Sequence, residues 1–268
     1  MIPTQTQLDQ TADLLLQVAD DEILPWFRRL GAQDIRSKTS ATDLVTVADE
    51  AAERVLTQEL RRRFPDALVI GEEAVSADPS LLDALAEAES AITIDPVDGT
   101  RNFAAGLAVF AVMVGFMEKG RPVAGIVCDP VVRDWAMARE GDGAWLRHGD
   151  GSRERMHVAG PKPIETMEGC GLWAHMHDAK RAAFAQRLTR CAGTSAYRCA
   201  GQECRAVASG RFDFVLYHKL TPWDLHREAG GYVAHHDGAD YDPLRREGGI
   251  LYAADRESWE AIREALLA

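Results

Sequence analysis

Apolar residues recur at helical spacing in two stretches near the start of the chain. The first stretch predicts an amphipathic helix that ends near Pro25, and the second predicts a helix that begins at Asp49. The apolar positions are Leu8, Ala12, Leu15, Val18, Ala19, Ile23 and Trp26 in the first helix, and Ala52, Val55, Leu56 and Leu60 in the second. Four charged residues of the second helix are expected to face solvent: Glu53, Arg54, Arg61 and Arg62. The mostly polar residues 38–48 predict a loop or hairpin between the helices.

Two short apolar runs, residues 67–70 and 91–94, predict buried strands that each end in a pair of carboxylates. The carboxylates are Glu72 and Glu73 after Gly71 in the first case, and Asp95 and Asp98 in the second. A helix is expected between the strands, with Asp78 as N-cap, Pro79 at its first position and Ser90 near its end. Glu72 and Glu73 could be ordinary surface acids, but their position directly after a strand and a glycine favours a site.

Four further apolar runs are separated by turn residues, which predicts antiparallel strands in a meander. The runs are residues 109–117, 122–128, 134–139 and 144–146. Residues 1–150 are therefore expected to form an α+β half, in which two early helices pack on a mostly antiparallel sheet.

A polar segment at residues 148–163 precedes a second half, residues 151–268, in which strands and helices alternate. The expected strands are 167–170, 195–198, 212–216 and 250–253, and the expected helices are 178–189, 202–209, 225–229 and a closing helix capped by Asp255. This alternation is typical of an α/β unit and predicts a second sheet with helices on it.

Composition and charge narrow the class of protein. The net charge of −12 over 268 residues argues against nucleic acid or an anionic membrane surface as the main partner. The five cysteines are odd in number and lack the spacing of a zinc site. The polar N-terminus does not resemble a signal sequence, and no run approaches the ~20 apolar residues of a membrane helix. We therefore expect a cytoplasmic protein with reduced thiols.

The stretch that carries the most chemistry follows the strand at 91–94 and reads Asp95-Pro96-Val97-Asp98-Gly99-Thr100. Two carboxylates and a glycine turn at the end of a buried strand can form a metal and phosphate site. The same residues could equally cap a strand-to-helix turn. This stretch alone does not decide between the two interpretations.

Three motifs stand in order along the chain and together are specific. They are Gly71-Glu72-Glu73, Asp95 to Phe103, and Pro222-Trp223-Asp224, and the segment 38–49 with its Asp43-Leu44-Val45-Thr46 core adds a fourth. Together they resemble the inositol monophosphatase family of Mg²⁺-dependent, lithium-sensitive phosphatases, over nearly the whole chain. The resemblance implies a five-layered αβαβα sandwich, a homodimer, and the hydrolysis of a small phosphorylated metabolite similar to inositol 1-phosphate.

The resemblance also implies a set of oxygen ligands for two, and up to three, Mg²⁺ ions about 4 Å apart. The ligands would be Glu72, Asp95, the carbonyl of Val97, Asp98 and Asp224. Glu72, Asp49 and Thr100 would be catalytic: Thr100 would orient a metal-activated water, and Asp49 would accept the proton of the Thr100 hydroxyl. Hydrolysis would be direct, without a phosphoenzyme.

Substrate contacts are implied at five positions: Asp98, Gly99, Thr100, Ala200 and Tyr217. Gly99 and Thr100 would offer backbone N–H groups to a phosphate oxygen. Glu203 could contribute to the substrate loop, but a solvated acid in the first turn of a helix is the more ordinary interpretation. Lys38 could draw in an anionic substrate or cover the site, or it could be a solvated loop lysine.

The chain departs from the family pattern in two places. Family members that act on inositol phosphate carry a glutamate seven residues before the motif aspartate, where this chain has Tyr217. In addition, about six residues of the helix that normally follows Asp224 are absent, some two turns. Either the helix is truncated, or residues are missing from the numbering and an abnormally long Cα–Cα step is expected close after Asp224.

Several alternatives stay open. Histidinol-phosphate phosphatase, fructose-1,6-bisphosphatase and 3′-phosphonucleotide phosphatase share the metal ligands and differ in the substrate loops. A regulatory protein that keeps the fold as a scaffold is a further alternative, although it would have no need for the complete carboxylate set. The pairs His175 with His177 and His235 with His236 lack further ligands at useful spacing, which argues against zinc.

Overall fold

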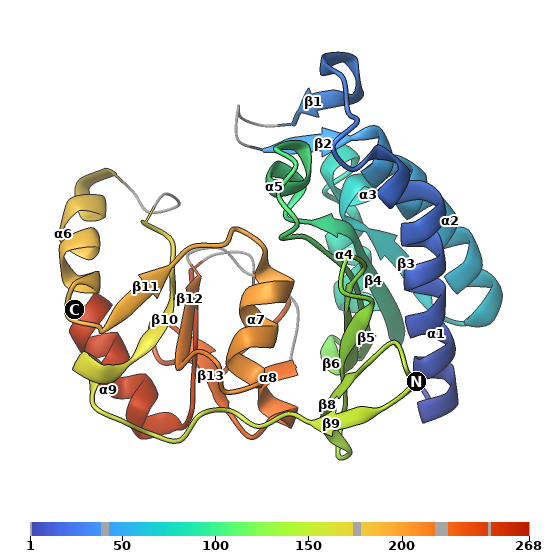
Figure 1. Cartoon of the computed structure of the whole chain (residues 1–268). Coiled ribbons are helices and arrows are strands. Elements are labelled where there is room, and N and C mark those ends of the chain that lie inside the picture. Colours follow the sequence, from blue (N-terminus) through green and yellow to red (C-terminus); the bar gives the residue numbers. More distant parts are fainter. Residues whose placement is uncertain (1, 39–42, 174–177, 218–224, 246–247, 268) are drawn as a thin grey trace.

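The computed structural model describes residues 2–38, 43–173, 178–217, 225–245 and 248–267. Two sheets carry the architecture, with helices outside each sheet and between them (Figure 1). The α-helices are α1 (Gln5–Val18), α2 (Val47–Arg63), α3 (Glu72–Ala77), α4 (Leu81–Glu87), α5 (Thr100–Ala104), α6 (Asp178–Leu188), α7 (Ala200–Ala208), α8 (Leu225–Glu228) and α9 (Arg256–Leu267). No described helix has the length and apolarity needed to cross a membrane.

A seven-stranded sheet lies against α1 and α2, and its strands follow the order β3-β4-β5-β6-β7-β8-β9. Only β3 and β4 pair in parallel, and the other neighbours pair antiparallel, as a meander requires. The strands are β3 (Leu68–Gly71), β4 (Ser90–Asp98), β5 (Ala111–Glu118), β6 (Arg121–Asp129), β7 (Asp134–Arg139), β8 (Gly143–Arg147) and β9 (Arg153–Arg155), and a separate hairpin pairs β1 (Ile35–Ser37) with β2 (Leu44–Thr46). The short strand β9 falls in the polar segment that the sequence left without structure.

A five-stranded sheet forms the other half in the order β11-β10-β12-β14-β13, with the first three strands parallel and β14 antiparallel to both of its neighbours. The strands are β10 (Glu168–Gly171), β11 (Gly193–Ser195), β12 (Phe214–Tyr217), β13 (Tyr232–His235) and β14 (Ile250–Ala253). The sequence pattern missed β13 and placed β11 two residues too late.

The core is divided into layers by the period-two alternation of the strands. On β5, Val112, Val114 and Phe116 pack with α1 and α2, whereas Ala111 and Met113 face the opposite side, toward α7 and α8. Helix α7 also packs on the five-stranded sheet, through Cys204 and Val207, and α6 and α9 cover the far face of that sheet. The order helix, sheet, helix, sheet, helix confirms the five-layered αβαβα sandwich (Figure 1).

Local capping explains where the first helices begin and end. The hydroxyl of Thr46 accepts a hydrogen bond from the N–H of Ala48, and Asp49 accepts the N–H of Thr46, which forms a capping box at the start of α2. Helix α1 continues through a π-turn and a 3₁₀ turn to Trp26, so the predicted end near Pro25 is confirmed. The expected N-cap at Asp78 is wrong, because that side chain bonds Ser80 in a turn and α4 begins at Leu81.

Candidate metal and phosphate site

The end of β4 delivers the two aspartates of the central motif. Pairing between β4 and β5 is regular up to Asp95 and shifts register before Asp98, so the strand bulges at the motif. Gly99 then turns the chain into α5 with φ 87°, and a Cβ at this position would lie 2.9 Å from the carbonyl oxygen of Val109. Only glycine combines this left-handed turn with so close an approach of backbone.

Asp98 is held by the N-terminus of α7. Its Oδ1 accepts the N–H of Ala200 at 3.1 Å, and its Oδ2 accepts the N–H of Gly201 at 2.6 Å and the thiol of Cys199 at 3.0 Å. Burial raises the pKa of Asp98 to about 6, although these three hydrogen bonds oppose the shift. The structure therefore brings Asp98 and the predicted substrate residue Ala200 into direct contact.

The carboxylate of Asp95 has an oxygen atom that accepts no hydrogen bond from the described residues. Among the described residues, its Oδ1 is one of the few buried side-chain oxygens without a hydrogen-bond partner. Burial raises the pKa of Asp95 well above its usual value, and the negative charges of Glu72 and Asp98 raise it further. A buried carboxylate oxygen that lacks a donor and faces two other carboxylates has the chemistry of a cation ligand.

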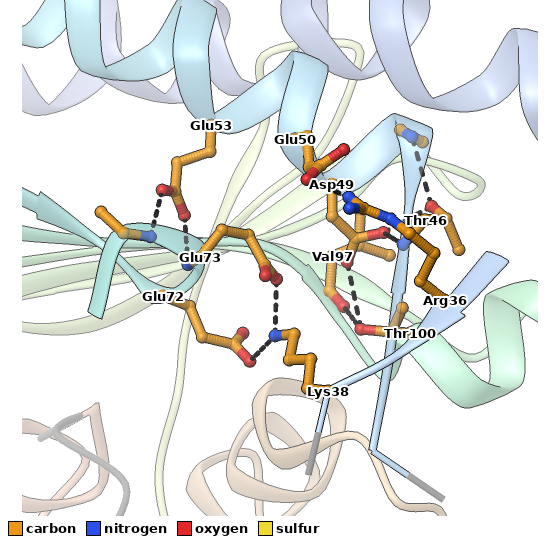
Figure 2. Close-up of polar contacts among 12 residues, drawn as sticks. Arg36, Lys38, Thr46, Asp49, Glu50, Glu53, Glu72, Glu73, Val97 and Thr100 are labelled. Carbon is orange, nitrogen blue, oxygen red and sulfur yellow. Dashed lines mark hydrogen bonds and ion pairs between the residues drawn. The ribbon is translucent and has the colours of Figure 1, made fainter. Parts of the chain in front are cut away.

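Glu72 and Glu73 begin α3 and share the ammonium group of Lys38 (Figure 2). The Nζ of Lys38 lies 2.9 Å from Oε1 of Glu72 and 2.7 Å from Oε1 of Glu73. Burial opposes the charge of Lys38, but the two glutamates outweigh it and raise the pKa of the ammonium group. Because only 9% of the Lys38 side chain is exposed, its interpretation as a solvated loop lysine is wrong.

Glu53 positions the start of α3 and was missed as a site residue. Its Oε2 accepts the N–H of Glu73 at 2.7 Å and its Oε1 accepts the N–H of Ala74 at 2.9 Å (Figure 2). Glu53 is buried, so its predicted place on the solvated face of α2 is wrong. The available signal was its spacing from Asp49, since residues four apart share one face of a helix.

The hydroxyl of Thr100 lies near both Asp49 and the carbonyl group of Val97, and its contact with Asp49 is the one that the family resemblance implies (Figure 2). The hydroxyl of Thr100 lies 3.1 Å from Oδ1 of Asp49 and 2.9 Å from the carbonyl oxygen of Val97, and it can donate to either. Burial raises the pKa of Asp49 to about 6, against its hydrogen bonds from Thr46 and Thr100. A partly protonated carboxyl near neutral pH beside a hydroxyl is suited to proton transfer.

Tyr217 and Glu203 support the N-terminus of α7. The hydroxyl of Tyr217 donates to the carbonyl oxygen of Ala200 at 3.3 Å and also interacts with the carboxyl group of Glu203. Oε1 of Glu203 accepts the N–H of Tyr197 at 2.7 Å and that of Arg198 at 3.1 Å. Glu203 is 4% exposed, so its interpretation as a solvated acid is wrong, and burial raises its pKa to about 7.

Some predictions fall outside the described residues. Asp224, Trp223 and the chain step after Asp224 lie there, as do His175 and His177. His235 is described: its Nδ1 lies 3.3 Å from the carbonyl oxygen of Gly249, and its Nε2 accepts the N–H of Asp242 at 3.0 Å. Both ring nitrogens are therefore engaged in hydrogen bonds to the backbone.

The donor set fits a hard divalent cation. Within the described ranges, no three Asp, Glu, His or Cys side chains are already gathered as metal ligands, and one expected ligand, Asp224, lies outside those ranges. Asp95 is influenced by the charges of Glu72 and Asp98, and these three side chains carry only oxygen donors, which Mg²⁺ prefers over nitrogen and sulfur. Two observations fit a metal site: Oδ1 of Asp95 has no hydrogen-bond partner in the described part of the chain, and Glu72 already binds a cationic group, the ammonium of Lys38.

Known proteins share this architecture over nearly its full length. The solved inositol monophosphatase of Thermotoga maritima superposes with a TM-score of 0.80 at 25% identity and covers 98% of this chain and 97% of its own. A staphylococcal inositol monophosphatase solved with its products superposes with a TM-score of 0.81 at 19% identity, over 99% and 97% of the two chains, and shows the same fold.

Proteins with similar sequences point to the same family as the solved structures. A Thermotoga maritima protein named fructose-1,6-bisphosphatase/inositol-1-monophosphatase is 28% identical over 87% of this chain and 86% of its own length. The Nus factor SuhB of Pseudomonas aeruginosa is 31% identical over 88% of each chain. The family model described as the inositol monophosphatase family matches residues 5–267. The chain belongs to the inositol monophosphatase family.

Proposed function

We propose that this chain is a Mg²⁺-dependent phosphomonoesterase that hydrolyses a small phosphorylated metabolite. Family membership supports a metal-dependent phosphatase, and relatives from Mesorhizobium japonicum and Caulobacter vibrioides are named inositol-1-monophosphatases. The observation that carries the proposal is Oδ1 of Asp95, which is buried without a hydrogen-bond partner beside the charges of Glu72 and Asp98. Such an arrangement is costly unless a cation neutralises it.

Two or three Mg²⁺ ions would be held by oxygen ligands from both halves of the chain. These ligands are Glu72, Asp95, the carbonyl of Val97, Asp98 and Asp224. When bound, the ions would lower the pKa of water and neutralise charge on the phosphate. Each remaining step is assigned to a residue of this chain.

Thr100 and Asp49 would act on the attacking water. With its own proton donated to Asp49, the Thr100 oxygen can accept a hydrogen bond from that water and orient it. The raised pKa of Asp49 suits a group that receives a proton near neutral pH. The N–H groups of Gly99 and Thr100 would bind a phosphate oxygen, and Asp98, Ala200 and Tyr217 would line the substrate.

Phosphate release tests the proposal. The purified protein should release phosphate from at least one of inositol 1-phosphate, histidinol phosphate, fructose 1,6-bisphosphate and adenosine 3′,5′-bisphosphate, with Mg²⁺ and not with EDTA. Thr100→Val should lower kcat by roughly 10²-fold because it removes the orienting hydroxyl, whereas Thr100→Ser retains it. Release from no member of the panel, with Mg²⁺ binding intact, would contradict the proposal.

A regulatory function on the same scaffold is the second candidate, because a relative that is 31% identical is named a Nus factor. Within the phosphatase class, fructose-1,6-bisphosphatase and histidinol-phosphate phosphatase remain the alternatives. A protein that only binds a partner would not depend on Thr100, so the Thr100→Val and Thr100→Ser pair separates a regulatory role from catalysis.

The assembly expected from the family resemblance is a homodimer that acts in the cytoplasm. Light scattering on the purified protein should give a mass near twice the 29.4 kDa of one chain. If the measured mass equals that of a single chain at all micromolar protein concentrations, the dimer is contradicted and the proposed chemistry is unaffected.

A further inference from the structure

Two arginines flank the Gly99–Thr100 turn and form no ion pair within the described part of the chain. Arg101 is the second residue of α5 and is exposed. Arg198 directly precedes the N-cap residue of α7 and is partly buried. Neither guanidinium group has a carboxylate partner among the described residues, although the protein carries a net charge of −12 and acidic groups line this site.

The two arginines come from segments that touch. The carbonyl oxygen of Arg198 lies 3.5 Å from the position that a Cβ of Gly99 would take. Next to Arg101, the Nδ2 of Asn102 donates to the carbonyl oxygen of Tyr197 at 2.7 Å, which ties α5 to the turn before α7. Burial, and after it the positive charge of Arg101, lower the pKa of Arg198, so the two cations are close enough to repel each other.

The backbone of Arg198 is held in a conformation that arginine rarely adopts. Its φ is 57°, in the left-handed region that favours glycine. Glu203 holds this conformation, because its Oε1 accepts the N–H groups of both Tyr197 and Arg198. A strained residue that its surroundings hold in place is common where a side chain serves a ligand.

Like charges that are brought together without a counterion are unfavourable, whereas two guanidinium groups beside one another match the oxygens of a phosphate. Arg101 directly follows Thr100 and the carbonyl oxygen of Arg198 lies beside Gly99, so an anion held by this pair would lie next to the expected phosphate site. It would be a second anionic group of the same substrate molecule.

We propose that Arg101 and Arg198 bind a second phosphate group of the substrate, so that the preferred substrate is a small bisphosphate. The proposal rests on the proposed function, because the phosphate that is cleaved is the one at Gly99 and Thr100. Tyr217 fits this preference, since its hydroxyl is turned toward Ala200 and Glu203 and contributes no charge toward an anionic substrate.

Matched substrates test the subsite. Fructose 1,6-bisphosphate and fructose 1-phosphate share the reacting ester and differ only in the second phosphate. Each should be assayed with the wild type, Arg101→Gln and Arg198→Asn, since asparagine tolerates the left-handed backbone. Arg62→Gln, an exposed position on α2, is the control. Adenosine 3′,5′-bisphosphate and 3′-AMP form a second matched pair.

We expect KM for one of the bisphosphates to rise about tenfold or more in each site variant, as the loss of a charge-assisted contact implies. Values for the matched monophosphate and for the Arg62→Gln control should stay within about twofold. Equal effects on both members of each pair, or no effect, would overturn the subsite while leaving the phosphatase activity established.

If no compound is hydrolysed, the proposed function fails and binding still decides the subsite. Calorimetric titration of the wild-type protein should then show tighter binding of the bisphosphate than of its monophosphate partner, and Arg101→Gln and Arg198→Asn should remove the difference. Equal affinities for the two members of each pair in the wild type would overturn the subsite.

Discussion

The Nζ of Lys38 lies 2.9 Å from Oε1 of Glu72, so an ammonium group of the chain already neutralises a carboxylate that we expect to bind metal. A divalent cation at Glu72 must compete with this contact. We expect Lys38→Met to tighten Mg²⁺ binding by roughly three- to tenfold, because the competing charge is lost and Glu73 is left uncompensated.

Calorimetric titration with Mg²⁺ measures the effect of Lys38→Met directly, and Lys38→Arg, which keeps the charge, is the control. Weaker Mg²⁺ binding by Lys38→Met would show that the lysine supports the metal site instead of competing for it.

Asp98→Asn should abolish activity, and the hydrogen bonds of Asp98 add a cost to stability. Both carboxylate oxygens accept backbone N–H groups, those of Ala200 and Gly201. An asparagine amide would present its NH₂ to one of these donors, so we expect the free energy of unfolding to fall by about 1–3 kcal/mol. Urea denaturation and phosphate release measure the two effects, and near-normal activity would refute the assigned role.

Glu53→Gln should weaken metal binding although Glu53 is not one of the expected metal ligands. The two oxygens of Glu53 each accept one N–H of the first turn of α3, and glutamine can satisfy only one of them. We expect a loss of about 1–2 kcal/mol in stability and weaker Mg²⁺ binding, because Glu72 stands in that turn. Glu50→Gln is the matched control on α2, since Glu50 is exposed and pairs with the exposed Arg36. Equal effects of the two substitutions would contradict the capping role.

Glu203 should make stability fall as pH rises toward neutrality. Burial raises its pKa from the usual 4.5 to about 7, so between these values the folded protein binds a proton that the unfolded chain has lost. The unfolding free energy therefore declines across this window, by up to about 3 kcal/mol from this residue. Glu203→Gln should flatten the decline, because its amide oxygen can still accept the N–H groups of Tyr197 and Arg198. Urea midpoints from pH 4.5 to 7.5 give the comparison, and an unchanged slope would show that Glu203 titrates normally.

Local sequence patterns were sufficient for most of the helices and strands and for the groups at strand ends, whereas the five-layered arrangement came from the family resemblance. The apolar runs before Glu72 and Asp95 became β3 and β4, and the helical stripes became α1 and α2. The pairing of Asp49 with Thr100, 51 positions apart, came from the family resemblance and not from any local pattern.

Two of the errors have a shared physical cause, which is a hydrogen bond from the backbone to a glutamate side chain. The helical pattern places Glu53 on the solvated face of α2, but α3 packs against it, and its partners Glu73 and Ala74 lie 20 and 21 residues away in the chain. The strand expected at 195–198 ends at Ser195, because Glu203 accepts the N–H groups of two of the three residues that would have continued it, and because the backbone of Arg198 is left-handed. Neither contact is visible in hydrophobic periodicity.

The left-handed backbone at Arg198 has a consequence for protein engineering. Glycine at this position would relieve a strain of about 1–2 kcal/mol, so a screen for heat resistance should enrich Arg198→Gly. The selected variants would lack the guanidinium group, so they would be more stable but less selective between a bisphosphate and its monophosphate. If Arg198→Gly raises the melting temperature and lowers the preference for the bisphosphate, the arginine is retained for ligand binding and not for stability.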